Sequence, residues 1–223
     1  MKVSIAIDGP VGSGKSTIAK AVAEAANIVY IDTGAMYRAV AFYNIRNGVD
    51  LTNKSAVENT LADIYIDINY DAENRQRLIL NGEDVSDKLR TLEAGEGAST
   101  VAVIQAVREK LVSLQQELAR KYDAVMDGRD IGTHVLPNAQ VKIYLDASVE
   151  ERTRRRCSEL EKIGEEADFK QVMEAIKIRD ERDMNREFSP LVKAADAIYL
   201  NTDGLTIQEI TNIIIDEMKK VRG

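Results

Sequence analysis

Short runs of apolar residues recur along the chain, and five of them end in an aspartate or an asparagine. These runs are Val3–Asp8, Ile28–Asp32, Ala124–Asp127, Val141–Asp146 and Ala197–Asn201. Continuous apolar runs of this length are typical of parallel strands that are buried on both faces. Helical patterns separate most of them, which predicts an α/β fold with a parallel sheet and with ligands at the carboxyl ends of its strands. We therefore expect the terminal acidic and amide side chains to cluster there.

Residues 63–90 depart from this alternation. Two apolar runs, Ile64–Asn69 and Arg77–Leu80, flank the turn-rich segment Tyr70–Asn74, and a second tight turn begins at Asn81-Gly82. Strand-like runs joined by such turns predict a small antiparallel insert.

Residues 147–186 also depart from the alternation, because they are strongly charged and mostly helical in pattern, with an interruption at Lys162–Glu166. This pattern predicts a helical hairpin that covers the sheet as a lid. A later helical pattern places Ile207 and Met218, with the isoleucines between them at 210 and 214, on one side, as in ordinary core packing.

A glycine-rich segment joins the first apolar run to a helical pattern at Ser16–Ala25, and it satisfies the phosphate-loop spacing Gly-x-x-x-x-Gly-Lys-Ser. The residues of this loop, with the one that follows, are Gly9, Pro10, Val11, Gly12, Ser13, Gly14, Lys15, Ser16 and Thr17. Glycines let backbone N–H groups approach phosphate oxygens at the positive end of a helix. Lys15 brings a positive charge to the outer phosphates, and the Ser16 hydroxyl is placed to ligate Mg²⁺. The segment therefore predicts a nucleoside triphosphate bound with Mg²⁺.

Length and composition indicate the domain organisation and the cellular location of the protein. Its 223 residues contain no internal repeat and no proline-rich or serine-rich linker, which favours one α/β unit with insertions, or at most two small domains. The apolar run at the start is too short for a signal peptide, and the single cysteine, Cys157, has no partner for an internal disulfide or a zinc site. We therefore expect a cytoplasmic protein with no membrane partner.

A net charge of −7 argues against nucleic-acid binding driven by overall charge. The chain does carry a basic cluster at Arg152–Arg156, but residues 151–186 contain as many acidic as basic side chains. A local phosphate clamp suits this cluster better than nucleic acid.

Two polar segments follow predicted strands. In Asp32–Arg38, the side chain of Arg38 is suitably located to meet a phosphate. The segment Asp127–Thr133 packs two carboxylates, an arginine and two glycines into seven residues. Its Asp130 can accept a hydrogen bond from the N4 amino group of a cytosine, whereas a uracil would aim its O4 acceptor at the same carboxylate. This segment is therefore a candidate base-reading site.

The spacing of Arg179, Asp183 and Arg186 places all three on one helix face. Two interpretations fit that spacing: a phosphate clamp of two arginines steadied by a carboxylate, or a salt-bridged face in solvent. The only histidine, His134, lacks support for a Ser-His-Asp arrangement and is interpreted as a structural or surface residue.

Taken together, four motifs closely resemble those of the bacterial cytidylate kinases. They are Gly9–Thr17, Asp32–Arg38, Asp127–Thr133 and Arg179–Arg186. The phosphate loop alone indicates a superfamily, whereas the last three motifs in this order are specific to cytidylate kinases, and the resemblance covers nearly the whole chain.

The resemblance implies a P-loop kinase fold, with a five-stranded parallel sheet flanked by helices, a small antiparallel insert and a helical lid. It also implies three parts. The core comprises residues 1–62, 97–150 and 184–223, the nucleoside-monophosphate-binding insert residues 63–96, and the lid with its following helix residues 151–183.

Roles for single residues also follow from the resemblance. The implied cytosine-binding residues are Ser99, Arg108 and Asp130. Thr33, Tyr37 and Arg38 would hold the nucleotide and its phosphate, Asp183 would contact the sugar, and phosphate charge would be gathered by Arg129, Arg179 and Arg186. The implied catalytic set is Lys15, Arg129, Arg154, Arg156 and Arg179. Thr33 stands where some members carry serine, so the hydroxyl is kept.

The implied reaction transfers the γ-phosphoryl group of ATP to CMP or dCMP, giving CDP or dCDP and ADP, in pyrimidine nucleotide metabolism. Mg²⁺ would be the cofactor, and the chain would act as a monomer on these small molecules without nucleic acid. Because the acceptor oxygen is already anionic, we expect catalysis by positioning and charge neutralisation, without a strong general base.

Two other functions stay open at this point. Another small-molecule P-loop kinase, such as a thymidylate, shikimate or dephospho-coenzyme A kinase, would share the loop but not the two later arginine-containing motifs. A nucleotide-dependent switch would carry an Asn-Lys-x-Asp motif. The chain instead has Asn53-Lys54-Ser55-Ala56, with alanine in place of the aspartate.

Overall fold

The computed structural model describes residues 2–73, 75–162 and 164–222. The chain divides into two compact units, of which the first comprises residues 1–28 and 123–223 and the second comprises residues 29–122. The second unit is therefore an insertion between two stretches of the first.

The first unit holds most of a parallel sheet and the helices around it. Its elements are β1 (Ser4–Asp8), α1 (Lys15–Ala26), β6 (Ala124–Gly128), the short helix η2 (Ile131–Val135), β7 (Val141–Asp146), α6 (Val149–Lys162), α7 (Phe169–Asn185), β8 (Ile198–Asn201) and α8 (Ile207–Arg222). β1 pairs in parallel with β6 and β7, and β7 pairs in parallel with β8. All five residues of β1 are buried, as expected for a central strand with an uninterrupted apolar sequence.

The complete sheet has five strands in the order β2-β6-β1-β7-β8, where β2 is Val29–Asp32. The predicted α/β fold with a five-stranded parallel sheet is confirmed. In the register of the first unit, Asp127 lies opposite Ile7, and Asp146 lies opposite Asn201. The acidic and amide ends of these strands therefore do reach the same edge of the sheet.

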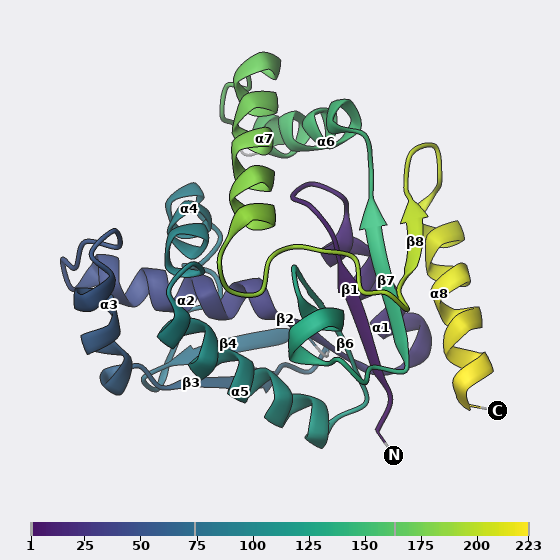
Figure 1. Ribbon diagram of the computed structural model, residues 1–223, viewed down its shortest axis with the longest axis horizontal. Coiled ribbons are helices and arrows are strands. Elements are labelled where there is room, and N and C mark those ends of the chain that lie inside the picture. Colours follow the sequence, from purple (N-terminus) through teal and green to yellow (C-terminus); the bar gives the residue numbers. More distant parts are fainter. Residues whose placement is uncertain (1, 74, 163, 223) are drawn as a thin grey trace. The chain divides into compact units, whose positions relative to one another are not determined.

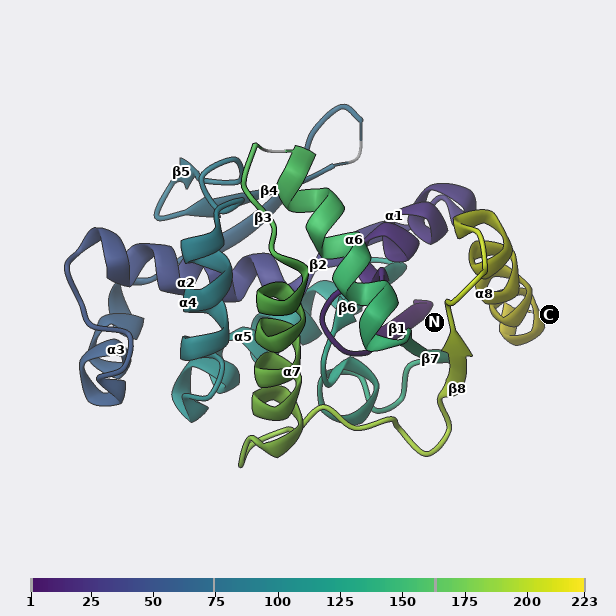
Figure 2. The same cartoon turned by 90° about the horizontal axis from the view of Figure 1, so that it is seen from above.

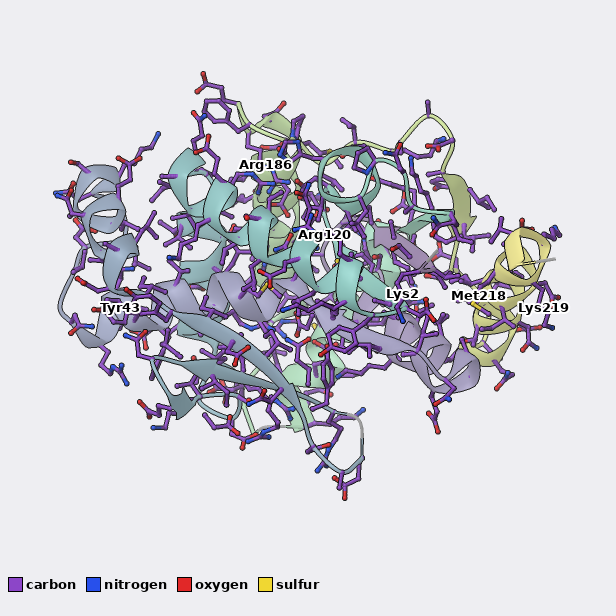
Figure 3. All side chains as sticks on the ribbon, turned by 90° about the horizontal axis from the view of Figure 1, so that it is seen from below. Lys2, Tyr43, Arg120, Arg186, Met218 and Lys219 are labelled. Atoms are coloured by element: carbon purple, nitrogen blue, oxygen red, sulfur yellow. The ribbon has the colours of Figure 1, made fainter. Side chains whose placement is uncertain are left out.

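Helices α1 and α8 pack against each other, and α8 also contacts β7 (Figure 1). Figure 3 shows Met218 on the side of α8 toward the rest of the unit and Lys219 on its outer side. Ile210, Ile214 and Met218 are buried, as the helical spacing predicts. The prediction was wrong for Ile207, whose side chain is 52% exposed because it begins the helix, before the first turn reaches the core.

The charged segment after β7 forms two helices, α6 and α7, that pack against each other (Figures 1 and 2). The predicted helical hairpin is thus confirmed, although Ile163 in its connection lies outside the described residues. α7 begins at a side-chain cap, where the Asp168 carboxylate accepts a hydrogen bond from the Gln171 amide at 2.8 Å. It ends at Asn185, because Arg186 has an extended backbone conformation, with φ −66° and ψ 143°. The prediction that Arg186 shares the helix face was therefore wrong.

The second unit combines helices with a small antiparallel sheet. Its elements are β2, α2 (Thr33–Arg46), α3 (Lys54–Thr60), η1 (Leu61–Asp63), β3 (Ile66–Tyr70), β4 (Gln76–Leu80), β5 (Glu83–Asp84), α4 (Leu92–Val101) and α5 (Gln105–Lys121). The strand order β3-β4-β5 confirms the predicted insert. Asn81 and Gly82 both have positive φ, 51° and 83°, as a two-residue hairpin turn requires. Asn74, in the other turn, lies outside the described residues. Helices α2 and α4 lie side by side (Figure 2).

The three-part division into core, insert and lid stays a prediction. It is defined by the roles of the parts in function, whereas the two units are defined only by how compactly the chain folds. Within the described ranges, no helix combines the length and the apolar character that a membrane crossing needs.

Candidate active site

The phosphate loop connects β1 to α1 and lies directly against β7. Gly9 has a φ of 152°, and a Cβ atom at this position would lie 1.9 Å from the carbonyl oxygen of Leu145. Only glycine fits at such a distance. The loop ends at Gly14, whose φ of 88° leads into the first turn of α1. The loop backbone is therefore held at the carboxyl edge of the sheet, where the helix amides begin.

Lys15 folds back over this loop. Its Nζ donates hydrogen bonds to the Pro10 carbonyl at 2.6 Å and to the Ser13 hydroxyl at 3.2 Å, and the residue is 5% exposed. Burial lowers the pKa of Lys15 well below its usual value, and the positive charge of Arg129 adds to the effect, while Asp127 opposes it. An anionic partner therefore strongly stabilises the charged form of this buried ammonium.

Ser16, in the first turn of α1, donates a hydrogen bond from its hydroxyl to the Asp127 carboxylate at 2.7 Å. Asp127 belongs to β6 and is 6% exposed. A serine hydroxyl and a carboxylate are both oxygen ligands, and Mg²⁺ commonly combines one or two such groups with phosphate oxygens and water. The donor set therefore fits the metal predicted at Ser16.

Asp8 connects the strand before the loop with the segment that carries Asp130. Its carboxylate accepts hydrogen bonds from the backbone amides of Ile131 and Gly132, both at 2.7 Å. Burial, helped by nearby Asp130, raises the pKa of Asp8 to about 6 against the lowering effect of these two bonds. Asp8 thus fixes the backbone immediately after Asp130.

Asp130 itself forms a buried ion pair with Arg186. Arg186 Nη2 lies 3.3 Å from Asp130 Oδ1, and the two side chains are only 4% and 7% exposed. Arg186 Nε also donates to the Ser189 carbonyl at 2.5 Å. The interpretation of Asp183 and Arg186 as part of a solvent-exposed face is wrong, because both side chains are buried.

Asp183 is the centre of an arginine cluster. Its carboxylate accepts a hydrogen bond from Arg129 Nε at 2.7 Å. Burial opposes ionisation of Asp183, but Arg129, Arg179 and Arg186 together hold its pKa below the usual value. Burial likewise opposes the charge of Arg129, yet Asp183 raises the pKa of that guanidinium. The three arginines predicted to gather phosphate charge therefore all act electrostatically on one carboxylate, and Arg129 is in direct contact with it.

The arginines of α6 are divided between the phosphate loop and the helix surface. Arg152 donates to the Val11 carbonyl at 3.0 Å, and Arg155 donates to the Ser13 carbonyl at 3.4 Å and to the Thr202 hydroxyl at 3.0 Å. The two arginines predicted to be catalytic form ion pairs on their own helix, Arg154 with Glu151 and Arg156 with Glu159. The catalytic role of Arg154 and Arg156 stays a prediction.

The remaining predicted residues lie in the second unit, mainly at the start of α2. Asp32 caps this helix by accepting from the Ala35 amide at 2.9 Å, and its other oxygen pairs with Arg38 Nη2 at 2.7 Å. The Arg108 guanidinium lies 5.8 Å from the centre of the Tyr37 ring. The other two, Thr33 at the first position of α2 and Ser99 in α4, are both buried.

Four residues of the first unit received no individual site role from the sequence. They are Asp8, Asp127, Arg152 and Asp180. Asp8 and Asp127 end predicted strands, and that position already indicated that they lie at the edge of the sheet where ligands are expected. No such signal marks Arg152 within the basic run, because the phase of a helix against a loop decides which arginine turns inward.

The sequence model of a family described as cytidylate kinase matches residues 5–220 of the chain. The chain belongs to the cytidylate kinase family. The cytidylate kinase of Caldicellulosiruptor bescii is 46% identical over 220 residues, which cover 99% of this chain and 97% of the relative. The cytidylate kinase of Anoxybacillus flavithermus is 49% identical over 214 residues, covering 96% of this chain and 95% of the relative. The family predicted from the motifs is confirmed.

The chain is also similar in fold to a solved structure. The crystal structure of an uncharacterized protein from Eubacterium ventriosum has a TM-score of 0.53 at 16% identity and covers 99% of both chains. That likeness concerns the fold alone. Family membership, by contrast, rules out the switch protein and the other P-loop kinases considered from the sequence.

Proposed function

We propose that the chain transfers the γ-phosphoryl group of ATP to CMP or dCMP, which yields ADP and CDP or dCDP in pyrimidine nucleotide metabolism. The observation that carries this proposal is the match to the cytidylate kinase family over residues 5–220, which include every motif of the site.

The donor nucleotide would bind at Gly9–Thr17. Backbone amides of the loop and the first turn of α1 would hold the phosphates, and the Lys15 ammonium would neutralise charge on the outer ones. Burial disfavours the charged form of Lys15, and a bound phosphate would stabilise that form, which supports this role. Ser16 and Asp127 would hold Mg²⁺, which when bound neutralises charge on the phosphate oxygens.

For the acceptor, the proposed cytosine-binding residues are Ser99, Arg108 and Asp130, and the proposed sugar contact is Asp183. The acceptor phosphate would be held by Thr33, Tyr37, Arg38, Arg129, Arg179 and Arg186. The arginines around Asp183 support the phosphate role, because three guanidinium groups act on this one carboxylate and guanidinium groups bind phosphate oxygens strongly.

No group in this proposal removes a proton from the acceptor. A phosphate oxygen of CMP is already anionic at neutral pH, so the work of the protein is to align two polyanions and to offset their charge. Arg154 and Arg156 would join this task when α6 and α7 close over the phosphates, and closure would exclude water.

We also propose that the protein acts as a cytoplasmic monomer that binds no nucleic acid. The net charge of −7 supports the absence of nucleic-acid binding, and the single cysteine supports a cytoplasmic location. Light scattering would then give the mass of a single chain, 24.7 kDa.

The experiment is a coupled ADP-release assay with Mg·ATP and a panel of acceptors: CMP, dCMP, UMP, AMP, dTMP and shikimate. The proposal predicts that CMP and dCMP give the highest kcat/KM. Lys15→Ala should depress turnover with every acceptor, which separates donor from acceptor effects. Equal activity across the panel, or a preference for a non-cytidine acceptor, would refute the substrate assignment.

A further inference from the structure

One residue of the phosphate loop is held by an ion pair that no part of the reaction scheme uses. The Val11 amide donates to Asp180 Oδ1 at 3.2 Å, and the Val11 carbonyl accepts from Arg152 Nη1 at 3.0 Å. Arg152 Nη1 also contacts Asp180 Oδ2 at 2.5 Å. Both backbone groups of Val11 are therefore bound by one arginine and carboxylate pair.

The ion pair between Arg152 and Asp180 is buried. The side chains of Arg152 and Asp180 are 9% and 10% exposed. Arg152 also donates from Nε to the Ala147 carbonyl at 3.0 Å, which anchors the guanidinium to the end of β7. Charged hydrogen bonds in such surroundings are costly to break singly, because the remaining partner stays buried with its charge.

Helix α6 also packs on the loop next to Val11. A Cβ atom on Gly12 would lie 3.1 Å from Arg152 Cβ and 3.3 Å from the Arg152 carbonyl oxygen. The loop backbone at Val11 and Gly12 is therefore in direct contact with the start of α6, and Asp180 adds a contact from α7.

The same helix α7 reaches the arginine cluster. Asp183 lies three residues after Asp180, on the same side of α7, and pairs with Arg129. One face of α7 therefore carries two buried carboxylates, of which Asp180 holds the donor loop and Asp183 holds the arginines of the acceptor phosphate.

We propose that Arg152 and Asp180 are positioning residues that fix the phosphate-loop backbone at Val11 in the conformation that binds the donor phosphates. The inference rests on the proposed binding of ATP at Gly9–Thr17. In this role the pair touches no substrate and acts through Val11. It makes donor affinity depend on how α6 and α7 pack against the loop.

The variant that tests the pair most directly is Asp180→Asn. An amide has one acceptor oxygen, so its NH₂ group must face either the Val11 amide or the Arg152 guanidinium, and a donor then opposes a donor. We expect the affinity for Mg·ADP, measured by calorimetry without any acceptor, to fall at least about tenfold, the loss typical of a broken charged hydrogen bond. Affinity for CMP alone should change much less.

The matched control is Glu181→Gln, the same chemical change at the next residue of α7, whose side chain is exposed. It should leave both affinities unchanged. If Asp180→Asn does not fold, Arg152→Lys serves instead, because it keeps the charge but cannot reach all three acceptors of the guanidinium. Measurements well below each thermal midpoint keep loss of structure apart from loss of affinity.

Three results would overturn the inference: Mg·ADP affinity unchanged in both Asp180→Asn and Arg152→Lys, an equal loss of ADP and CMP affinity, or a loss equal to that of Glu181→Gln. The first and third of these outcomes use Mg·ADP alone, so they do not depend on which acceptor the enzyme phosphorylates. Failure of the proposed function would appear in the acceptor panel with the wild-type protein.

Discussion

At the scale of single residues, the burial of Asp130 supports its proposed role in discriminating between bases. The side chain of Asp130 is 7% exposed and accepts from Arg186, and the backbone that follows it is fixed by the bonds of Asp8 to the next two amides. A buried acceptor that cannot turn away accepts from the amino group of cytosine and repels the carbonyl of uracil.

Asp130→Asn should therefore relax base selection. The amide keeps the shape of the side chain and can donate to O4 of uracil, so the ratio of kcat/KM for CMP over UMP should fall about ten- to a hundredfold. Steady-state assays with both acceptors measure this ratio, and the KM for Mg·ATP should stay near that of the wild type. An equal loss of activity with CMP and UMP would show that Asp130 does not read the base.

The raised pKa of Asp8 predicts that the stability of the protein depends on pH. Burial raises its folded-state pKa from 3.8 to about 6, so between these values the folded chain binds a proton more readily than the unfolded chain. The stability contributed by this group is complete below the lower value and is lost as pH rises through the upper one. The effect amounts to about 3 kcal/mol for a shift of this size.

The measurement is urea unfolding of wild type and Asp8→Asn at steps between neutral pH and about pH 4, the range over which a raised carboxyl pKa acts. The wild type should gain free energy of unfolding relative to the variant as the pH falls. Comparing the two proteins cancels the titration of the other carboxylates. A difference that stays constant with pH would contradict the raised pKa.

At the scale of elements, the sequence predicted the strands of the main sheet to within one residue at each end. Buried parallel strands are short apolar runs bounded by polar residues, so their limits are visible in the sequence. The end of α7 was not visible, because Arg186 leaves the helix to reach Asp130 and Ser189. Which arginines of α6 face the loop was hidden for the same reason: tertiary contacts decide it.

The contact between α6 and the phosphate loop predicts different costs for two glycine substitutions. Gly12 and Gly204 have the same φ of 75°, but only at Gly12 would a Cβ atom meet other atoms, those of Arg152. Alanine at either position should cost about 1–2 kcal/mol of unfolding free energy from the backbone conformation. Gly12→Ala should cost more, and it should also weaken Mg·ADP binding, because α6 must move away from the loop.

Thermal or urea unfolding, with calorimetric titration of Mg·ADP, compares the two variants. Gly204→Ala is the control, since a Cβ atom there meets nothing within 4 Å. Equal stability and equal nucleotide affinity in the two variants would show that the packing of α6 on Gly12 has no energetic role.

At the scale of the whole molecule, the proposed donor residues all belong to the first unit, whereas the proposed acceptor residues come from both. Thr33, Tyr37, Arg38, Ser99 and Arg108 lie in residues 29–122, and Asp130 and Asp183 lie in the first unit. The resemblance to the family implies these residues, and all of them except Ser99 and Arg108 lie in local motifs that are visible in the sequence. The sequence could not assign them to units, since the boundaries at residues 28 and 122 carry no linker composition.

This distribution predicts two patterns of ligand protection in hydrogen exchange measured by mass spectrometry. Mg·ADP alone should slow exchange at residues 9–17 and at the start of α6, all within the first unit. CMP alone should slow exchange in the second unit, at residues 33–38 and 99–108, and also near residues 129–130 and 183–186, because binding removes local opening only where the ligand makes contacts. UMP at the same concentration controls for the phosphate and sugar, and should protect less near Asp130. Protection by CMP confined to one unit would contradict the assignment of acceptor residues to both.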